Sequence, residues 1–501
     1  MEINTEVLVV GAGPAGLTTA LLLARQGAAV ECIDKHPGVS MLPRARGVHA
    51  RAVEILRACG VEEDMRAAEL GITPRVTIRP DLASPPLREI VTGGAGLSNV
   101  SPCEGIAIAQ DVFDGVLRKH TTRAGVPIHN EVELRGYEVT DSGVITDLYE
   151  RRTRSGFTAS CRYLVGADGW ASQVREAMGA VAQGPDDLGS NRAVAFRADL
   201  TSWVPDPPPA LVQLTSTSAV LLHTHSDHRW VVIRPAVQGG PDDAADLVRE
   251  SLGLPHLDLD VGTDWTWTAA AQLADHFANG PVYLVGDAAH RVPPAGATGI
   301  SSAMADAYNL TWKLAAVLQG WGGPALLDSY AVERRQVGRT TTQAALELWR
   351  SRENPGQVPI DLRMLDMGYV YGDPDSLVGD LAGPYMPTAR AGSRAPHVWL
   401  NGNRPRSTLD LFGPGFTVLA AAEAHIWQDA TSLAAARTGV PLTVSLRAEP
   451  AFADAYEISG TTAVLIRPDG HLACRLPPAP EPSSAAKSLI NAVENAARVQ
   501  R

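Results

Sequence analysis

The chain has 501 residues, a formal net charge of −12 and 45% hydrophobic residues. A chain of this length predicts about two to four domains around a large buried core. The negative charge and the lack of a basic stripe exclude a typical nucleic-acid-binding protein, because such a surface repels phosphate.

The same composition indicates a reducing compartment. The five cysteines are widely spaced and form neither a CxxC motif nor a metal-binding pattern. We therefore expect free thiols, a cytoplasmic location and no metal site. No stretch reaches the roughly 18–20 apolar residues that span a bilayer, and the N-terminus lacks the basic and apolar regions of a signal peptide. We expect no membrane partner.

The N-terminal segment has the pattern of a βαβ unit that binds a dinucleotide. Four apolar residues, 7–10, predict a buried parallel strand, and the glycine motif GAGPAG follows. Gly11 allows a tight turn, Gly13 lets the backbone approach a pyrophosphate, and Gly16 lets the next helix pack on the sheet. That helix, expected over 15–26, directs its N-terminal N–H groups at the phosphates.

A second strand, predicted over 29–33, places Asp34 beside the glycine motif. There its carboxylate can accept a hydrogen bond from a ribose hydroxyl, whereas a 2′-phosphate would be repelled. The strand, the helix and the acid together distinguish this unit from a chance GxGxxG match. The unit predicts binding of the ADP-ribose part of FAD or NAD and does not choose between them.

The middle of the chain has a different texture. Helices are predicted at 50–58 and from residue 110, with strands and long loops over the Pro-, Gly- and Ser-rich residues 71–102. Residues 131–165 alternate between apolar and polar and predict a small antiparallel sheet. Residues 190–275 alternate strand patterns with Pro-rich turns. We expect them to form an antiparallel sheet inserted between parts of the nucleotide-binding domain.

Two more predicted strands end in a glycine and an acid. The first leads into Asp168-Gly169, which either organises the backbone around a dinucleotide or forms an Asx turn that caps the next helix. The second, 282–285, leads into Gly286-Asp287. An acid at the carboxyl end of a parallel strand points into the cleft where such sheets bind ligands, so Asp287 could accept hydrogen bonds from sugar-alcohol hydroxyls.

A glycine turn, 296–299, precedes a helix expected over 302–318. The N–H groups around Ser301 can face an electron-rich ring such as a reduced flavin, or Ser301 or Ser302 can simply cap the helix. Composition shifts again near residue 390. The remaining residues predict a separate α/β domain with strands near 416–420, 442–446 and 463–467 and a helix from residue 483.

In this order and spacing, the motifs resemble the single-component FAD-dependent aromatic monooxygenases of the p-hydroxybenzoate hydroxylase type, over about the first 390 residues. The matching stretches are GAGPAG with Asp34, Pro43-Arg44-Ala45 with Gly47, Gln110, residues 165–175, Gly286-Asp287 with His290 and Pro293, and residues 306–314. The resemblance implies FAD as the cofactor. It implies that Arg44 contacts this cofactor, that Gln110 reaches its ribityl and flavin region, and that Asp287 holds its ribityl chain.

The resemblance also implies that the loop 296–301, called the flavin loop below, lies against the isoalloxazine. The candidate cofactor-binding residues are Gly11, Gly13, Pro14, Ala15, Gly16, Asp34, Lys35, Arg44, Gln110, Asp168, Asp287, Pro294, Gly299, Ile300 and Ser301. The flavin loop departs from the pattern GGxGxNxG of many relatives, because Ser301 replaces the asparagine and Ala303 the last glycine. Asp34 replaces a glutamate that is frequent in the family.

The C-terminal part resembles the thioredoxin-like domain of phenol hydroxylase and of bacterial aromatic-polyketide hydroxylases, most clearly over residues 462–471. Without a CxxC motif, it is expected to have a structural or homodimer-supporting role. The predicted fold class is α/β, with a Rossmann-like FAD-binding domain, an inserted antiparallel-sheet substrate domain and a thioredoxin-like domain. Their predicted boundaries are 1–70 with 103–180 and 277–390, 71–102 with 181–276, and 391–501.

The family resemblance implies a reaction cycle. NAD(P)H, with NADPH favoured, reduces FAD, the reduced flavin captures O₂ as a C4a-hydroperoxide, and the distal oxygen is transferred to an electron-rich substrate. The sequence has one dinucleotide fingerprint, which suits a nicotinamide that binds transiently. The leading hypothesis is hydroxylation of a phenolic or polycyclic, polyketide-like aromatic compound in antibiotic tailoring.

Two other functions stay open. One uses the same flavin chemistry for epoxidation, Baeyer–Villiger insertion or ring cleavage. The other is a flavin-binding protein without turnover, whose C-terminal domain serves interactions. For the hydroxylase, a base or polarising group would help a phenol to ionise. The candidate catalytic residues are Arg46, His223 and His225, with Arg197 and Tyr308 as further possibilities.

Overall fold

The first strand of the chain lies at the centre of an eight-stranded sheet, the N-terminal sheet, with strand order β16-β17-β8-β1-β2-β5 and the hairpin β6–β7 beside β8. In the computed structural model, which describes residues 3–42, 44–91, 99–225, 227–237, 240–351, 360–373 and 381–498, β1 pairs in parallel with β2 and β8. Its strands are β1 (Ile3–Val10), β2 (Val30–Asp34), β5 (Ile128–Asn130), β6 (Val132–Thr140), β7 (Gly143–Glu150), β8 (Ser155–Gly166), β16 (Ala278–Asn279) and β17 (Val282–Leu284).

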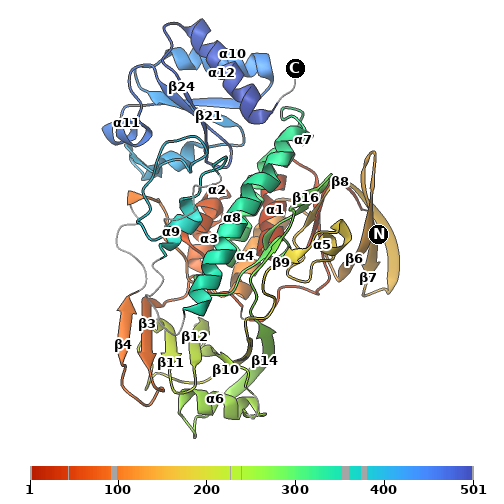
Figure 1. Ribbon diagram of the computed structural model, residues 1–501, viewed down its shortest axis with the longest axis vertical. Coiled ribbons are helices and arrows are strands. Elements are labelled where there is room, and N and C mark those ends of the chain that lie inside the picture. Colours follow the sequence, from red (N-terminus) through yellow and green to blue (C-terminus); the bar gives the residue numbers. More distant parts are fainter. Residues whose placement is uncertain are drawn as a thin grey trace.

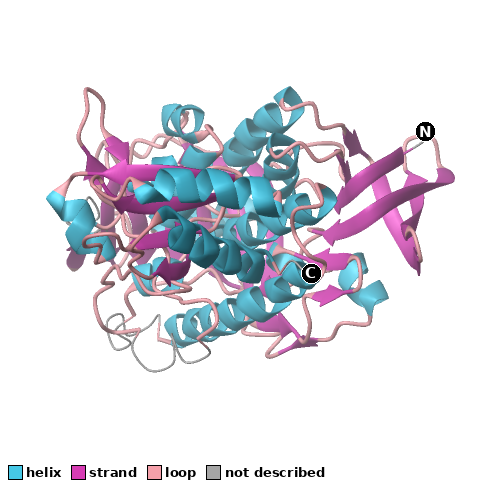
Figure 2. Ribbon diagram, turned by 90° about the horizontal axis from the view of Figure 1, so that it is seen from above, coloured by secondary structure: helices cyan, strands magenta, loops and turns pink. Residues whose placement is uncertain are grey.

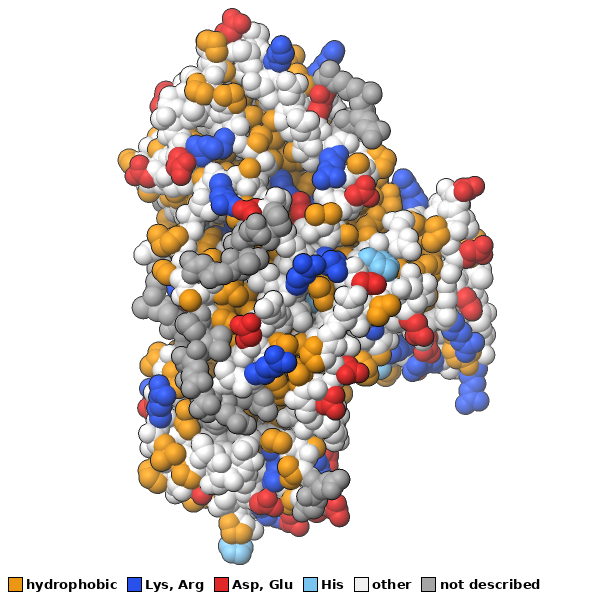
Figure 3. All heavy atoms as spheres, viewed as in Figure 1, with side chains coloured by type: hydrophobic (Ala, Val, Ile, Leu, Met, Phe, Trp, Pro, Cys, Tyr) orange, Lys and Arg blue, Asp and Glu red, His pale blue; other side chains and the backbone are white. Residues whose placement is uncertain are grey.

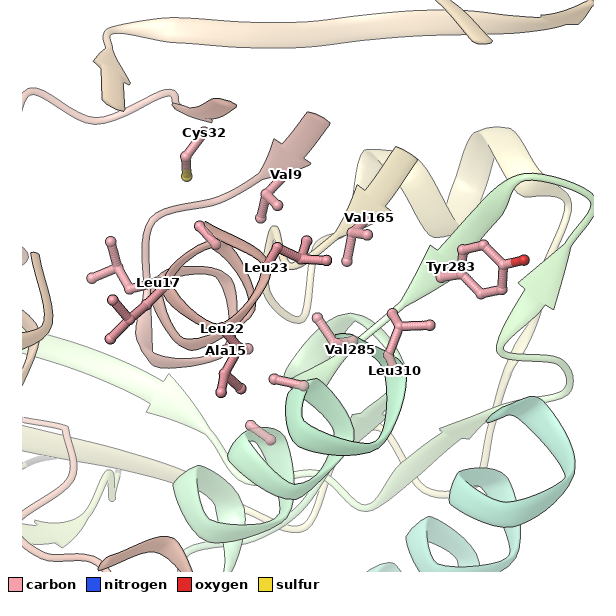
Figure 4. Close-up of a cluster of buried hydrophobic side chains, with 14 of the residues drawn as sticks. Val9, Ala15, Leu17, Leu22, Leu23, Cys32, Val165, Tyr283, Val285 and Leu310 are labelled. Carbon is pink, nitrogen blue, oxygen red and sulfur yellow. The ribbon is translucent and has the colours of Figure 1, made fainter. Parts of the chain in front are cut away.

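Helix α1 (Pro14–Arg25) covers this sheet and packs against α7 (Gly299–Leu318) and α4 (Gln110–Arg123). Leu17 and Leu23 of α1 are completely buried. Figure 4 shows the side chains of α1 between the strands and α7, in the same cluster as Val9 and Leu310. The predicted βαβ unit is therefore present. The continuous apolar run of β1 is explained by burial on both faces of the sheet.

The second sheet has seven strands in the order β14-β10-β13-β12-β11-β3-β4, and α6 packs on one face through a buried apolar cluster. Its pairs are antiparallel, as predicted, except β3–β11, which is parallel. β3 comes from the separate segment 71–102, outside the residues 190–275 for which the antiparallel sheet was predicted, and no hairpin fixes its direction. The elements are β3 (Thr73–Arg79), β4 (Arg88–Val91), β10 (Ser190–Arg197), β11 (Pro209–Leu214), β12 (Ala219–His225), β13 (Arg229–Pro235), β14 (Asp260–Thr268) and α6 (Ala244–Leu252).

The C-terminal domain has a four-stranded sheet in the order β22-β21-β23-β24, with one parallel and two antiparallel pairs. This arrangement, with helices beside it, is the predicted thioredoxin-like fold. Its elements are β21 (Phe416–Ala421), β22 (Leu442–Arg447), β23 (Ala463–Ile466), β24 (Leu472–Leu476), α10 (Ile426–Thr438), α11 (Pro450–Tyr456) and α12 (Pro482–Ala497). Trp312 of α7 belongs to the core of this domain, where it packs edge-on against Phe416.

Figure 1 shows the C-terminal domain at one end of the molecule, the N-terminal sheet in the middle and the second sheet at the other end. Helix α8 runs from the C-terminal domain towards the second sheet, and the β6–β7 hairpin projects beside the N-terminus in both views (Figures 1 and 2). The other elements are α2 (Ala50–Ala58), α3 (Glu62–Ala67), α5 (Gln173–Met178), α8 (Ala325–Arg350), α9 (Leu362–Met367), η2 (Gly286–Ala288), η3 (Thr408–Leu411), β9 (Ala182–Gln183), β15 (Gln272–Ala274), β18 (His290–Arg291), β19 (Trp399–Leu400) and β20 (Arg406–Ser407).

Several expectations concern the surface and the thiols. Acidic and basic side chains are interspersed on the face shown in Figure 3 and form no continuous basic stripe there. All five cysteines are free, and four of them are buried. Within the described part of the chain, no helix has the length and apolarity to cross a membrane. The same residues contain no group of three or more potential metal ligands. The predicted domain boundaries stay a prediction.

Candidate active site

Three neighbouring parallel strands end at one edge of the N-terminal sheet, and a glycine follows or ends each of them. Gly11 follows β1, Gly166 ends β8 and Gly286 lies just after β17. A Cβ on Gly286 would lie 2.9 Å from the Cβ of Ala15 and 3.1 Å from that of Ala303. The glycine motif, the turn after β17 and the beginning of α7 therefore meet at this edge.

The three glycines of the motif have different surroundings. Gly11 has a φ of +106°, and a Cβ on it would lie 2.3 Å from the carbonyl oxygen of Ala167. A Cβ on Gly16 would lie 1.8 Å from the carbonyl oxygen of Gly11. A Cβ on Gly13, in contrast, has no atom within 4 Å. The first and third glycines allow the protein to pack on itself, whereas the second leaves a space at its surface.

That space lies at the N-terminus of α1. The helix begins at Pro14, and its N-cap Gly13 has no side chain to satisfy the N–H groups of the first turn, to which Ala15 also belongs. An uncapped helix N-terminus with open space beside it is a binding site for a phosphate group. The residues present therefore fit the pyrophosphate of a dinucleotide.

Asp34 lies at the carboxyl end of β2, beside the same turn. Its Oδ2 accepts a hydrogen bond from the backbone N–H of Ala12 at 2.7 Å, and its Oδ1 accepts one from that of His36 at 2.7 Å. These bonds fix the carboxylate, and each oxygen keeps a second lone pair for a ribose hydroxyl. The neighbouring Lys35 is half-buried. The geometry agrees with the predicted role of Asp34.

Gln110 is the first residue of α4 and connects that helix to the segment around Arg44. Its Oε1 accepts from the backbone N–H of Ala45 at 3.2 Å, and its Nε2 donates to Oδ2 of Asp114 at 3.5 Å. The side chain of Arg44 is exposed, and Pro43, named with it in the family motif, lies outside the described residues. Gln110 therefore lies next to the segment that carries Arg44, and the contact of either residue with FAD stays a prediction.

Asp114 is a residue of this region that the sequence analysis missed. It is buried, and its Oδ1 has no hydrogen-bond partner in the structure. Burial raises the pKa of Asp114 to about 7, although Gln110 and Arg44 favour the charged form. A polar residue one helical turn after Gln110, next to the buried Phe113, is the sequence signal that could have revealed it.

Asp168 caps α5. Its Oδ1 accepts from the hydroxyl of Ser172 at 2.5 Å and its Oδ2 from the backbone N–H of Val174 at 3.1 Å. Ser172 in turn accepts from the backbone N–H of Arg175. Of the two interpretations left open by the sequence, these contacts support the cap. Direct contact between Asp168 and a cofactor stays a prediction.

The side chain of Asp287 reaches solvent in a hollow that Trp170, Arg175 and Arg291 also line. The protein around this hollow nevertheless raises the pKa of Asp287 through desolvation. An exposed carboxylate at a strand end can accept from the hydroxyls of a ribityl chain, so Asp287 suits its predicted role. Its pairing with such a chain stays a prediction.

Asp306 of α7 binds the turn that carries Asp287. The sequence analysis named this residue only as part of a family motif. Asp306 is completely buried. Its Oδ2 accepts from the backbone N–H of Gly286 at 3.1 Å and pairs with Nε2 of His290 at 2.7 Å. Its Oδ1 accepts from Nε of Arg334 at 2.7 Å, so this carboxylate connects the turn to α7 and α8.

The flavin loop leads directly into α7. The helix begins at Gly299, three residues before the predicted start, and its N-cap is Thr298, without a side-chain cap. The alternative in which Ser301 caps the helix is therefore wrong, because Gly299 and Ile300 already belong to it. The hydroxyl of Ser301 instead accepts from the backbone N–H of His49 at 3.1 Å. Pro294 is exposed just before the loop.

The candidate catalytic residues lie where the segment after β2 meets the second sheet. Nη1 of Arg46 donates to the backbone carbonyl of His223 on β12 at 3.0 Å. The His223 ring lies 4.8 Å from that of Trp230, which belongs to the buried cluster beneath α6. His225 pairs with Asp227 at 3.2 Å. Arg46 therefore joins the two parts of the site, whereas both imidazoles contact the sheet itself.

The two further possibilities are directed elsewhere. The hydroxyl of Tyr308 donates to the carbonyl oxygen of Pro468 in the C-terminal domain at 3.2 Å. Arg197 is exposed and pairs with Asp227 at 2.9 Å. Within the described residues, neither side chain hydrogen-bonds the flavin loop or the glycine motif. Residues 92–98, part of the predicted segment 71–102, lie outside the described residues.

The dinucleotide edge, the second sheet and the thioredoxin-like domain together define an FAD-dependent aromatic monooxygenase. Residues 4–345 match the family model described as an FAD binding domain, and residues 388–496 match the model described as aromatic-ring hydroxylase, C-terminal. The chain belongs to this family of FAD-dependent aromatic-ring hydroxylases. FAD is its cofactor, and NAD(P)H is the electron donor typical of the family.

Relatives of known name match over nearly the whole chain. A putative polyketide hydroxylase of Streptomyces halstedii is 35% identical and covers 94% of this chain and 93% of the relative. The tetracenomycin B2 monooxygenase-dioxygenase of Streptomyces olivaceus is 34% identical, with 95% of each chain covered. The solved ternary complex of aklavinone-11 hydroxylase with FAD and aklavinone has a TM-score of 0.90, with 29% identity and 99% of each chain covered.

Proposed function

We propose that this enzyme hydroxylates a phenolic ring of a polycyclic, polyketide-like aromatic substrate, with NADPH as the electron donor. Relatives named as polyketide and aklavinone hydroxylases support this substrate class. When bound and reduced, FAD supplies the activation of O₂ that lets one oxygen atom pass to the ring. The protein's own residues bind the cofactor, orient the substrate and control its charge.

Four groups of residues would hold FAD. The N–H groups at the start of α1 face the pyrophosphate, and Asp34 accepts from the ribose. Asp287 accepts from the ribityl hydroxyls. The uncapped N–H groups of Gly299 and Ile300 face the pyrimidine edge of the flavin, where the helix end favours negative charge.

Arg46 is the observation that carries the proposed role toward the substrate. Its guanidinium is largely enclosed, and burial lowers the pKa of Arg46 to about 10. Within the described residues it has no carboxylate partner, and its guanidinium donates a hydrogen bond to the neutral carbonyl of His223. A buried cation without a counter-charge is unfavourable in the free protein, and a bound anion would compensate it.

A phenol that binds beside Arg46 would therefore ionise more readily, because an opposite charge at close range lowers its pKa. The resulting phenolate is richer in electrons and reacts faster with an electrophilic oxygen. A pKa near 10 keeps Arg46 charged at neutral pH, so this residue acts by stabilising charge and does not accept the proton itself. The phenolic proton leaves to solvent.

The experiment is a pH titration of a bound phenolic substrate, followed by its absorbance, in wild type and in Arg46→Met. We expect the pKa of the bound phenol to rise by about 1 to 3 in the variant. Product formed per NADPH consumed should fall in parallel. Arg197→Met is the matched control, because this arginine is exposed and paired with Asp227. An unchanged phenol pKa in Arg46→Met would refute the role of Arg46.

A second candidate reaction is epoxidation, Baeyer–Villiger insertion or ring cleavage, because a relative that is 34% identical is named a monooxygenase-dioxygenase. The two departures in the flavin loop, Ser301 and Ala303, lie where they could alter the outcome of the oxygen reaction. Product NMR after turnover under ¹⁸O₂ separates simple hydroxylation from epoxidation, Baeyer–Villiger insertion or ring cleavage. One labelled hydroxyl on an intact ring supports the hydroxylase.

We also propose that the enzyme acts in the cytoplasm, where NADPH is available and its five thiols stay reduced. A homodimer supported by the C-terminal domain remains part of the proposal. Sedimentation of the FAD-loaded protein at several concentrations tests the dimer.

A further inference from the structure

His49 lies against the flavin loop and makes three separate connections there. It is the N-cap residue of α2, and its backbone N–H donates to the hydroxyl of Ser301 in the first turn of α7. Its Nδ1 pairs with Oδ2 of Asp366, on α9, at short range. The backbone of Gly296 also favours a proton on this imidazole. His49 therefore connects the flavin loop with α9, through its backbone N–H at Ser301 and its ring at Asp366.

This arrangement favours the charged form of the imidazole. Nδ1 faces an ionised carboxylate, which attracts a proton on the ring. Burial opposes the charge, but the attraction and hydrogen bond of Asp366, helped by the backbone of Gly296, outweigh it and raise the pKa of His49. Asp366 has a side chain only 9% exposed, so solvent screens the pair weakly.

The position of this charge gives it a second partner. The N-terminus of α7 has no side-chain cap, so its partial positive charge lies beside the imidazolium. Both face the loop against which the flavin of this family lies. We propose that His49, held by Asp366, is a positioning residue that places positive charge beside the pyrimidine edge of bound FAD and so favours its reduced, anionic state. This proposal rests on the proposed binding of FAD at the flavin loop.

Other charged groups near the pair have to be considered for any pH effect. A small cavity behind Ser301 is lined by Asp366 together with Arg51, Arg334 and Tyr369. Arg51 is paired with Glu54, and Arg334 with Asp306. Both arginines keep their charge over the working pH range. His49 is therefore the group expected to account for the pH dependence.

The test is the midpoint reduction potential of the FAD-loaded protein without substrate, measured by reduction with a reference dye at several pH values. His49→Gln removes the charge but keeps the backbone N–H that binds Ser301. We expect its potential to fall, equivalent to about a tenfold or greater loss of preference for reduced over oxidised FAD. The difference should be largest at low pH and vanish above the pKa of the imidazole.

Asp366→Asn should lower the potential by less than His49→Gln does, because it removes the negative charge of the carboxylate together with the imidazolium that this carboxylate stabilises. The double variant also lacks both charges, so near neutral pH it should match Asp366→Asn. His120→Gln is the matched control, since His120 forms a similar pair with Asp64 on α3. A potential equal to wild type across the pH range in both single variants would overturn the proposal. If His49→Gln does not retain FAD, Asp366→Asn decides by itself. The potential does not depend on hydroxylation, so failure of the proposed reaction would be seen separately.

Discussion

Substitution of the second glycine of the dinucleotide motif by alanine should weaken FAD binding without preventing the protein from folding. Gly13 has φ −85° and ψ −172°, an extended conformation that alanine adopts without strain. No protein atom lies within 4 Å of a Cβ added there. Gly13→Ala should therefore leave the free energy of unfolding of the apoprotein within about 1 kcal/mol of wild type, because alanine restricts the unfolded chain but is a poorer N-cap than glycine.

The same methyl group would occupy the space that we assign to the pyrophosphate. Overpacking of a close contact typically costs about 1–3 kcal/mol. The affinity of Gly13→Ala for FAD should therefore fall roughly 5- to 150-fold. The assay is a titration of apoprotein with FAD, followed by flavin fluorescence, beside thermal unfolding of the apoprotein.

Gly16→Ala is the contrasting variant. Its Cβ would lie 1.8 Å from the carbonyl oxygen of Gly11, so the backbone must move and the apoprotein itself should be destabilised. If Gly13→Ala unfolds at the wild-type temperature and also binds FAD with wild-type affinity, the space beside α1 is not the pyrophosphate site. The reasoning is equally refuted if Gly13→Ala destabilises the apoprotein as much as Gly16→Ala does.

Two further predictions concern buried charge. Glu54→Gln should lower the free energy of unfolding in chemical denaturation by about 3–5 kcal/mol, because it leaves the buried Arg51 and Arg394 without a counter-charge. The control is Glu89→Gln, from an exposed pair, which should cost at most about 1 kcal/mol. Equal effects of the two variants would contradict this prediction. Asp114→Asn should change the pH dependence of apoprotein unfolding. The pKa of Asp114 is raised to about 7 in the folded protein, so wild type loses stability as the pH rises from about 4 to 7. Compared with wild type, Asp114→Asn should therefore be more stable by up to about 4 kcal/mol at pH 8 and equally stable at pH 4. A constant difference at both pH values would show that Asp114 does not titrate as described.

Local sequence rules were sufficient for the dinucleotide edge. The glycine motif and Asp34 could be predicted because steric demands within one βαβ unit determine both residue type and spacing. The start of α7 could not, because glycine has a low intrinsic helix propensity and the prediction began the helix at residue 302, after Gly299. In the structure, the turn at Gly299 is held in place by contacts with α2 and α9 through His49.

The residues that sequence reasoning missed are buried polar groups with distant partners. Asp366 is 317 positions from His49, and Arg334 is 28 positions from Asp306. Neither pairing leaves a local periodic signal, since each exists only after separate elements have packed. The parallel pairing of β3 with β11 could not be predicted for a related reason. Alternation of apolar and polar side chains indicates which face of a strand is buried, but it does not indicate which strand pairs with it.

The packing of α7 explains why a thioredoxin-like domain without CxxC can still matter for the site. This helix has 20 residues, or about 30 Å of length, with the flavin loop at its beginning and Trp312 in the core of the C-terminal domain. Asp469 of that domain accepts hydrogen bonds from Asn309 and from Trp312 of α7. Movement of the C-terminal domain would therefore move α7 and, with it, the flavin loop from which this helix begins. These contacts hold α7 in place without any thiol chemistry.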